Sequence, residues 1–311
     1  MPEIYAKSTL NVSNAEAKTK IGHDGLEIQL LSELIEDDSK GIYHTAESVF
    51  SLARLKQYPV TVVHTPLYVE GTVYNLENLV TKKRVKLLHE VFHIANYYGM
   101  YQDMEVKVVV HTELSYSLMK ELGIWDNIVK TVDCMLRMFP YTQLVIENVT
   151  MLRSVHGLRY SSLCNNARFE CTEVVRQLRE KLQTSRIYTC LDTCHAMMSE
   201  REHKLFYADV FNRASEDLSL DRYFENFKDT VGLIHLADMR GMGIADVDHG
   251  VPFTEETCSR LDEILSLYKK YKYTCPITIE VRERDYLIND GYKETKRLVT
   301  QWFEESNNTS K

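Results

Sequence analysis

Short apolar runs alternate with longer segments of helical period along the chain, and this alternation constrains the fold most. Eight runs rich in β-branched residues lie at 3–9, 26–30, 60–64, 107–111, 143–147, 187–192, 233–238 and 277–281. Between them, segments such as 114–139 and 171–182 place apolar residues three and four positions apart, as in amphipathic helices. Nearly continuous apolar strands that alternate with helices indicate parallel strands buried on both faces. Eight such units predict a closed (β/α)8 TIM barrel, an α/β fold.

The sequence has no feature that would divide it into separate units. It lacks a linker, a low-complexity stretch and a block of like charges, so we expect a single barrel domain over residues 1–311. No apolar stretch is long enough to cross a bilayer, and the first ten residues lack the apolar core of a signal peptide. The seven cysteines are an odd number and are scattered along the chain, which argues against a disulfide framework, and the expected location is the cytoplasm.

Histidines and carboxylates gather where the predicted strands end. The residues concerned are His64, His111, Glu147, Asp192, His195, His235 and Glu280. In a barrel of this type the C-terminal ends of all strands meet at one mouth, where active sites form. Carboxylates and imidazoles that converge on one cavity need cations to neutralise them. Mixed imidazole and carboxylate ligation without thiolate suits zinc, manganese or iron, so we expect a divalent metal site.

These segments resemble endonuclease IV, a family of metal-dependent apurinic/apyrimidinic endonucleases within the xylose-isomerase-like barrel superfamily. The stretch "CLDTCHA" (190–196) is the most specific match. It is accompanied, in the family's order and with similar spacing, by "VVHTPLY" (62–68), "VVVH" (108–111), "VIEN" (145–148), "HLAD" (235–238) and "ITIEV" (277–281). The resemblance covers roughly residues 3–285.

The resemblance implies two or three metal ions per chain, with zinc expected first and manganese or iron as alternatives. One ion would be held by His64, His111 and Glu147. Glu147 would bridge to a second ion that is also held by Asp192, His235 and Glu280. A third would be held by His195 with Asp246, Asp248 and His249 of the loop 239–253, although this loop departs from the family's Asp-x-His pattern. Glu147 and Glu280 are expected to be catalytic.

The activity that the resemblance implies is hydrolysis of a phosphodiester, with incision of DNA 5′ to abasic sites. Close metals lower the pKa of a bridging water and stabilise the leaving oxygen. Leu67 and Tyr68, after the third strand, are expected to wedge into the duplex, and Arg153 and Arg159, after the fifth, to bind phosphate or sugar. The net charge of −8 provides no broad field for phosphates, so local basic residues and the metals would have to attract them.

Four other interpretations are compatible with parts of the sequence. Sugar isomerases and epimerases of the same superfamily use one metal, which here would be held by Glu147, Asp192, His235 and Glu280. A barrel that kept its ligands can also serve as a non-enzymatic binding subunit. The stretch "HEVFH" (89–93) fits a zinc-protease motif, but it lies in a predicted helix over 83–99 whose polar face, with His89, Glu90 and His93, we expect in solvent. Asp192 and His195 can finally be an N-cap and a first-turn histidine.

Overall fold

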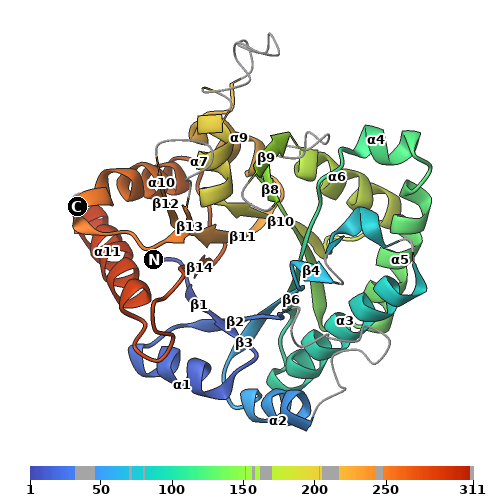
Figure 1. The fold of residues 1–311 in the computed structure, drawn as a ribbon, viewed down its shortest axis with the longest axis horizontal. Helices are drawn as coiled ribbons and strands as arrows, with labels where there is room; N and C mark the ends of the chain where they lie inside the picture. The colour runs from blue at the N-terminus through green and yellow to red at the C-terminus, as the bar shows by residue number, and fades with distance from the viewer. Residues whose placement is uncertain are drawn as a thin grey trace.

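A computed structural model shows the arrangement of the chain (Figure 1). The structure describes residues 1–31, 46–69, 72–79, 81–150, 152–155, 158–161, 170–202, 204, 217–241 and 248–308, with the backbone alone for 46–49, 152–155 and 158–161. Among the helices in these ranges, none has both the length and the apolar character that a membrane span needs.

Eight parallel strands close into a barrel in the order β1-β14-β11-β10-β7-β6-β3-β2. They are β1 (Ile4–Thr9), β2 (Gly25–Gln29), β3 (Val60–His64), β6 (Val106–His111), β7 (Thr142–Glu147), β10 (Ile187–Asp192), β11 (Val231–Leu236) and β14 (Ile277–Ile279). Each predicted run overlaps one barrel strand, with differences of at most two residues at the ends, so the predicted (β/α)8 fold is confirmed. The strands lie at the centre of Figure 1 and the helices surround them.

The outer ring consists of amphipathic helices that follow the strands in the chain. They are α1 (Val12–Ile21), α2 (Ala46–Leu55), α3 (Lys82–Gln102), α4 (Tyr116–Glu121), α5 (Trp125–Met138), α6 (Glu170–Leu182), α7 (Thr193–Glu202), α9 (Leu220–Phe227), α10 (Cys258–Lys270) and α11 (Asp290–Asn308). Short antiparallel hairpins are formed by β4 (Tyr68–Val69) with β5 (Thr72–Val73), β8 (Leu152–Val155) with β9 (Leu158–Ser161), and β12 (Asp238–Arg240) with β13 (Asp248–Val251). Two 3-10 turns, η3 (Leu76–Asn78) and η6 (Glu255–Thr257), complete the described elements.

The two faces of each barrel strand have different partners, because successive side chains of a strand point in opposite directions. On β2, Leu26 and Ile28 belong to the large core between strands and helices. The opposite faces fill the barrel with a second buried cluster: Tyr5, Val62, Val109, Val145, Cys190 and Leu233. The residues two positions further along those six strands are Lys7, His64, His111, Glu147, Asp192 and His235. A polar layer therefore lies directly on the apolar layer, toward the C-terminal ends of the strands.

Candidate metal centre

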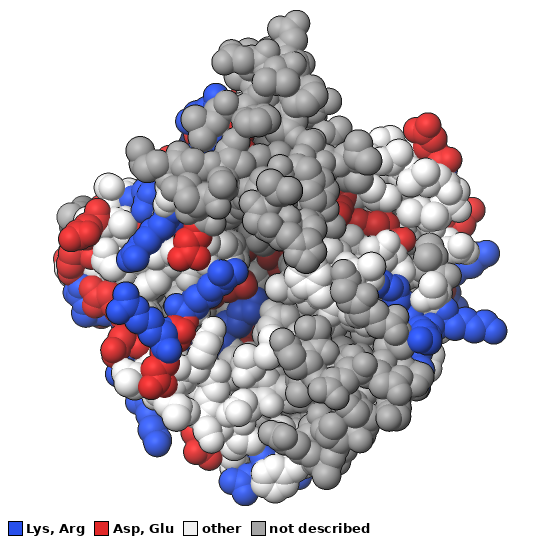
Figure 2. Space-filling view, in the orientation of Figure 1, with Lys and Arg blue, Asp and Glu red and all other residues white. Residues whose placement is uncertain are grey.

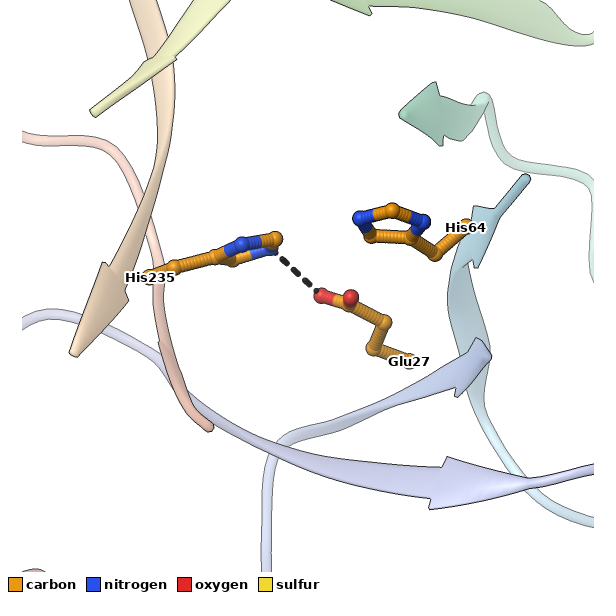
Figure 3. A group of neighbouring side chains, drawn as sticks. All are labelled: Glu27, His64 and His235. Atoms are coloured by element: carbon orange, nitrogen blue, oxygen red, sulfur yellow. Dashed lines mark hydrogen bonds and ion pairs between the residues drawn. The ribbon is translucent and has the colours of Figure 1, made fainter. Parts of the chain in front are cut away.

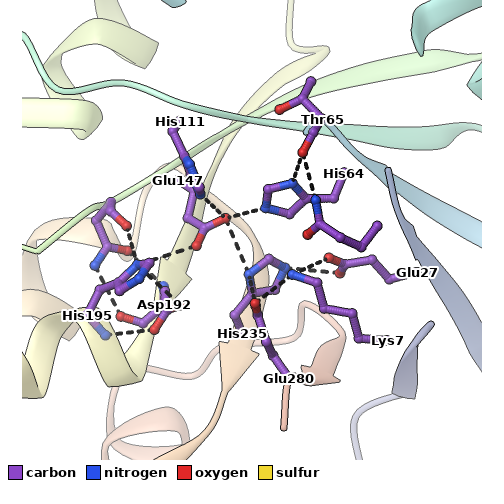
Figure 4. Close-up of polar contacts among 12 residues, drawn as sticks. Lys7, Glu27, His64, Thr65, His111, Glu147, Asp192, His195, His235 and Glu280 are labelled. Atoms are coloured by element: carbon purple, nitrogen blue, oxygen red, sulfur yellow. Dashed lines mark hydrogen bonds and ion pairs between the residues drawn. The ribbon is translucent and has the colours of Figure 1, made fainter. Parts of the chain in front are cut away.

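Glu147, the last residue of β7, lies at the centre of the polar layer and is 1% exposed. Its Oε2 atom is 3.1 Å from Nε2 of His64, 3.2 Å from Nε2 of His111 and 3.3 Å from Nδ1 of His235. These residues come from four different barrel strands and point toward one another in Figure 4. One carboxylate oxygen is thus shared by three imidazoles.

Asp192 connects the end of β10 to the start of α7. Its Oδ1 atom accepts a hydrogen bond from the backbone N–H of His195 at 2.8 Å, so the predicted N-cap role is present. Its Oδ2 atom is 3.2 Å from Nδ1 of His195 and 3.7 Å from Nε2 of His249. The rings of His195 and His249 are stacked with centroids 4.8 Å apart. The same carboxylate therefore caps a helix with one oxygen and faces two imidazoles with the other.

Backbone carbonyl groups fix the orientation of two of the histidines. Nδ1 of His64 lies 2.7 Å from the carbonyl oxygen of Thr65, and Nδ1 of His195 lies 2.8 Å from that of Asn148. A carbonyl only accepts, so each Nδ1 carries the proton and each Nε2 is left with a free electron pair. Asn148 also accepts from the backbone N–H of Asp192 at 2.7 Å and donates to its carbonyl at 3.1 Å. Asn148, whose role the sequence did not indicate, thereby joins the ends of β7 and β10.

Among the described residues, five groups of side chains have ligand atoms within 4.8 Å of one another, close enough to share a cation, and three of these groups contain only residues predicted from the sequence. They are Glu147, Asp192, His235 and Glu280 (the quartet); His64, His111 and Glu147; and Asp192, His195 and His249. The first two are the sets that the resemblance implied. In the third, Asp192 stands in place of the loop aspartates. Asp248 is exposed, with its carboxylate 3.6 Å from the guanidinium of Arg282, and Asp246 lies outside the described residues.

Two charged residues of the polar layer, Lys7 on β1 and Glu27 on β2, were not identified from the sequence. Oε2 of Glu27 is 3.0 Å from Nε2 of His235. The ring of His64 lies beside the Glu27 carboxylate, on the side away from His235 (Figure 3). The Lys7 ammonium is 3.1 Å from Oε1 of Glu27 and 2.7 Å from Oε1 of Glu280. A signal for them was present, because "EIYAKST" and "LEIQL" place polar residues in strands expected to be buried on both faces.

The carboxylates of this layer remain charged although they are buried. Burial disfavours the charged form of Glu147, but His235 and His111 outweigh it and hold its pKa well below the ordinary value. For Glu280, Lys7 and His235 outweigh burial in the same way and lower the pKa. Burial alone would lower the pKa of His235, whereas Cys190, Glu27 and Glu147 raise it well above the ordinary value. The cavity therefore attracts positive charge.

The side chains present fit a divalent metal ion. Four buried atoms of these groups, namely Nε2 of His111, Nδ1 of His235, Oε2 of Glu280 and Nε2 of His249, make no hydrogen bond within the described residues. They nevertheless lie within 3.7 Å of a carboxylate or imidazole partner, as co-ligands of one ion do. Imidazole and carboxylate donors suit zinc, manganese or iron. Cys190 also borders the cavity, but burial raises the pKa of its thiol and so disfavours the thiolate that would bind metal.

The predicted substrate-binding residues lie on hairpins between the barrel elements. Leu67 and Tyr68 are 44% and 48% exposed, with Tyr68 on β4. Arg153 and Arg159 lie on β8 and β9, paired across the hairpin with Tyr160 and Ser154. The side chains of these arginines are outside the described part of the chain.

The "HEVFH" segment lies on α3, within the outer ring of helices, as predicted. His93 is exposed, and the ring of His89 packs edge-on against Phe139 with centroids 5.0 Å apart. The expectation for Glu90 was wrong, because this residue is only 8% exposed and its carboxylate lies 3.8 Å from the Lys86 ammonium. Within the described residues, no group able to hold a metal includes this segment.

Comparisons with known proteins extend these observations. A search of curated proteins gives no match. Among solved structures, the IolI protein with a bound zinc atom is similar at a TM-score of 0.58 and 14% identity, with 97% of this chain and 98% of that chain covered. AsfvAP:AG gives 0.58 and 12%, with 97% and 99% covered. A D-allulose 3-epimerase from Methylomonas sp. gives 0.55 and 14%, with 97% and 98% covered. At these identities the likeness shows the fold alone.

A family model described as "Xylose isomerase-like TIM barrel" matches residues 51–302. This region contains all seven predicted strand-end residues, from His64 to Glu280, and the match agrees with the closed barrel. The match supports the superfamily named above but does not single out endonuclease IV within it. The chain belongs to the xylose isomerase-like TIM barrel family.

Proposed function

We propose that this chain is a metal-dependent isomerase or epimerase that acts on a small sugar-like substrate bearing a carbonyl group. The observation that carries the proposal is the quartet of Glu147, Asp192, His235 and Glu280, whose ligand atoms lie within 4.8 Å of one another at the barrel mouth. The D-allulose 3-epimerase fold supports it. This was the alternative interpretation of the sequence, and it now replaces phosphodiester hydrolysis as the first proposal.

The quartet provides two carboxylates on either side of one imidazole. Nδ1 of His235 lies 2.8 Å from Oε2 of Glu280 and 3.3 Å from Oε2 of Glu147. A divalent metal held there would polarise the substrate carbonyl. With a substrate bound between them, one ionised carboxylate would remove the proton from the carbon beside the carbonyl, and the other would take up a proton from solvent and deliver it to the opposite face of that carbon. Both carboxylates are ionised in the protein without a ligand, so either is able to act as the base.

The remaining residues of the site orient these groups. Asn148 and the N-terminus of α7 hold Asp192 in place. His195 lies beside Asp192 and Glu147, with its Nδ1 3.2 Å and 3.5 Å from their carboxylates. The apolar layer beneath, which includes Val109, Val145 and Leu233, closes the bottom of the cavity to water.

The direct test is exchange of carbon-bound hydrogen with solvent. The protein is loaded with Zn²⁺, Mn²⁺ or Co²⁺ and incubated with a panel of ketoses and aldoses in D₂O, and the sugars are followed by NMR. Incorporation of deuterium next to the carbonyl, lost after chelation, supports the proposal. Absence of exchange across the panel with all three metals contradicts it.

A second candidate is the phosphodiester hydrolase that the sequence favoured. The specific observation for it is that His64, His111 and Glu147, and Asp192, His195 and His249, form further groups able to hold a metal. On the face drawn in Figure 2, however, Lys and Arg side chains of the described residues are interspersed with Asp and Glu. The described residues on this face therefore form no uniformly basic surface for a polyanionic duplex.

The test of the second candidate uses a duplex oligonucleotide with one abasic site at low salt, beside the same duplex without it. Incision 5′ to the abasic site by the metal-loaded protein would favour the hydrolase. In that case Leu67→Ala with Tyr68→Ala should weaken binding more than chemistry. An uncut abasic duplex, under conditions in which sugars exchange, would leave the isomerase.

A further inference from the structure

Lys7 occupies the level of the barrel at which the metal ligands lie. It faces inward from β1, two residues beyond Tyr5 of the apolar layer, and its side chain is 12% exposed. Its ammonium lies 2.7 Å from Oε1 of Glu280 and 3.1 Å from Oε1 of Glu27 (Figure 4). Oε1 of Glu280, the oxygen that does not face His235, is therefore already paired with the Lys7 ammonium.

Glu27 is 0% exposed, and a carboxylate in such a position needs compensation at both oxygens. Oε1 faces Lys7, and Oε2 contacts Nε2 of His235 at 3.0 Å. Burial disfavours the charged form, but His235 and Lys7 outweigh it and lower the pKa of Glu27 to about 2. The His235 imidazole and the Lys7 ammonium thus compensate the negative charge of the Glu27 carboxylate.

The contact with Glu27 determines which nitrogen of His235 is available to a metal. A metal-bound histidine usually donates its other ring N–H to a carboxylate, which fixes the ring and its tautomer. With Nε2 directed to Glu27, the atom left for the metal is Nδ1, between Glu147 and Glu280. This is the geometry that the quartet requires.

The same residues also offer a competing arrangement. Glu27, His64 and His235 have ligand atoms within 4.8 Å of one another and form a group able to hold a cation themselves (Figure 3). A metal there would take the place of the direct contact between Glu27 and Nε2 of His235. It would also lie next to the Lys7 ammonium, and like charges repel strongly in a buried site.

We propose that Lys7 is a built-in cation that keeps metal out of the Glu27–His64–His235 group, so that Glu27 serves as the residue that positions His235. Lys7 and Glu27 thereby determine how many metals the barrel holds. The proposal requires that the quartet binds metal, but not that the reaction is an isomerisation.

The test counts metal ions per chain by elemental analysis after saturation with Co²⁺ and removal of the excess. Glu27→Gln should retain the wild-type number of equivalents while binding the quartet metal about 10–100-fold more weakly, as expected for loss of an orienting partner. Loss of one equivalent in Glu27→Gln would overturn the proposal, because Glu27 would then be a ligand. Titration with a competing chelator measures the affinity.

Removal of the ammonium provides the converse experiment. Lys7→Met should gain one equivalent, and Lys7→Met with Glu27→Gln should return to the wild-type number. Lys107→Met is the matched control, because Lys107 faces inward on β6 two residues before Val109 of the apolar layer, away from the mouth. An unchanged number in a folded Lys7→Met protein overturns the proposal, as does a wild-type protein that binds no metal. If Lys7→Met does not fold, the Glu27→Gln count decides.

Discussion

Glu147→Gln is the substitution that perturbs the centre most while keeping its shape. Three imidazole nitrogens lie 3.1–3.3 Å from Oε2 of Glu147, and this carboxylate is shared by three of the groups that could hold a metal. The amide that replaces it is neutral, so it is unable to act as a base and is a poor metal ligand. A positioned general base contributes about 10²–10⁴-fold to a rate, so kcat should fall by at least about 10²-fold.

Glu147→Gln should lower the free energy of unfolding by less than the loss of one partner from a typical buried ion pair does. Removing one partner of a buried ion pair costs about 3–5 kcal/mol. His235 keeps Glu27 at 3.0 Å and Glu280 at 2.8 Å, so we expect a loss of about 3 kcal/mol or less in the free energy of unfolding. The fold should therefore persist, as judged by circular dichroism and urea unfolding.

The assay is the rate of deuterium incorporation into the best sugar of the panel, with saturating metal. Glu90→Gln on α3 is the matched control, because Glu90 is also a buried glutamate beside a cation but lies outside the barrel. The reasoning is refuted if folded, metal-loaded Glu147→Gln keeps more than about a tenth of the wild-type rate, well above the range for loss of a base. It is equally refuted if Glu90→Gln loses activity.

Three further predictions concern metal removal, pH and packing. Chelation should lower the melting temperature, because a metal at about 100 times its Kd stabilises the folded state by about 2.7 kcal/mol; an unchanged melting temperature in differential scanning calorimetry would contradict this. Burial lowers the pKa of Lys18 to about 8 from 10.5, so the unfolded chain binds more protons in this window and the free energy of unfolding should rise by about 3 kcal/mol between pH 8 and 10.5. Urea unfolding should show this rise relative to Lys18→Met. Gly25→Ala places a methyl carbon 2.5 Å from Oγ1 of Thr61, so urea unfolding should show a loss of about 1–3 kcal/mol; wild-type stability would contradict it.

The sequence predicted the barrel because its strands are nearly continuous apolar runs at regular spacing. The same regularity predicted where polar residues would gather, since the ends of parallel strands must meet at one mouth. His64, His111, Glu147, Asp192, His195, His235 and Glu280 do lie together there. Their roles as ligands remain predictions.

What the sequence did not indicate depends on contacts between distant segments. Lys7 and Glu27 lie in the first two strands, before the strand ends that were considered, and only barrel closure brings them to His235 and Glu280. Because successive side chains of a strand point in opposite directions, the sequence could have shown that Lys7 and Glu27 point into the barrel. Asp248 was predicted to hold a metal together with its neighbour His249, but the structure separates the two side chains. Adjacent residues of β13 point to opposite sides, and the Asp248 carboxylate faces Arg282. The burial of Glu90 depends on the packing of α3 against its neighbours, which helical period alone does not specify.

The central claim is that the quartet binds a divalent metal, and metal content is the measurement that tests it most directly. Wild-type protein, His235→Gln and the exposed-histidine control His93→Gln are saturated with Zn²⁺, freed of excess and analysed for zinc and protein. We expect at least one equivalent per chain in wild type and in His93→Gln, and one fewer in His235→Gln. A single equivalent in wild type would favour the sugar isomerase, and two or more would favour the hydrolase. Metal-free wild-type protein, or an undiminished zinc content in folded His235→Gln, would contradict the account.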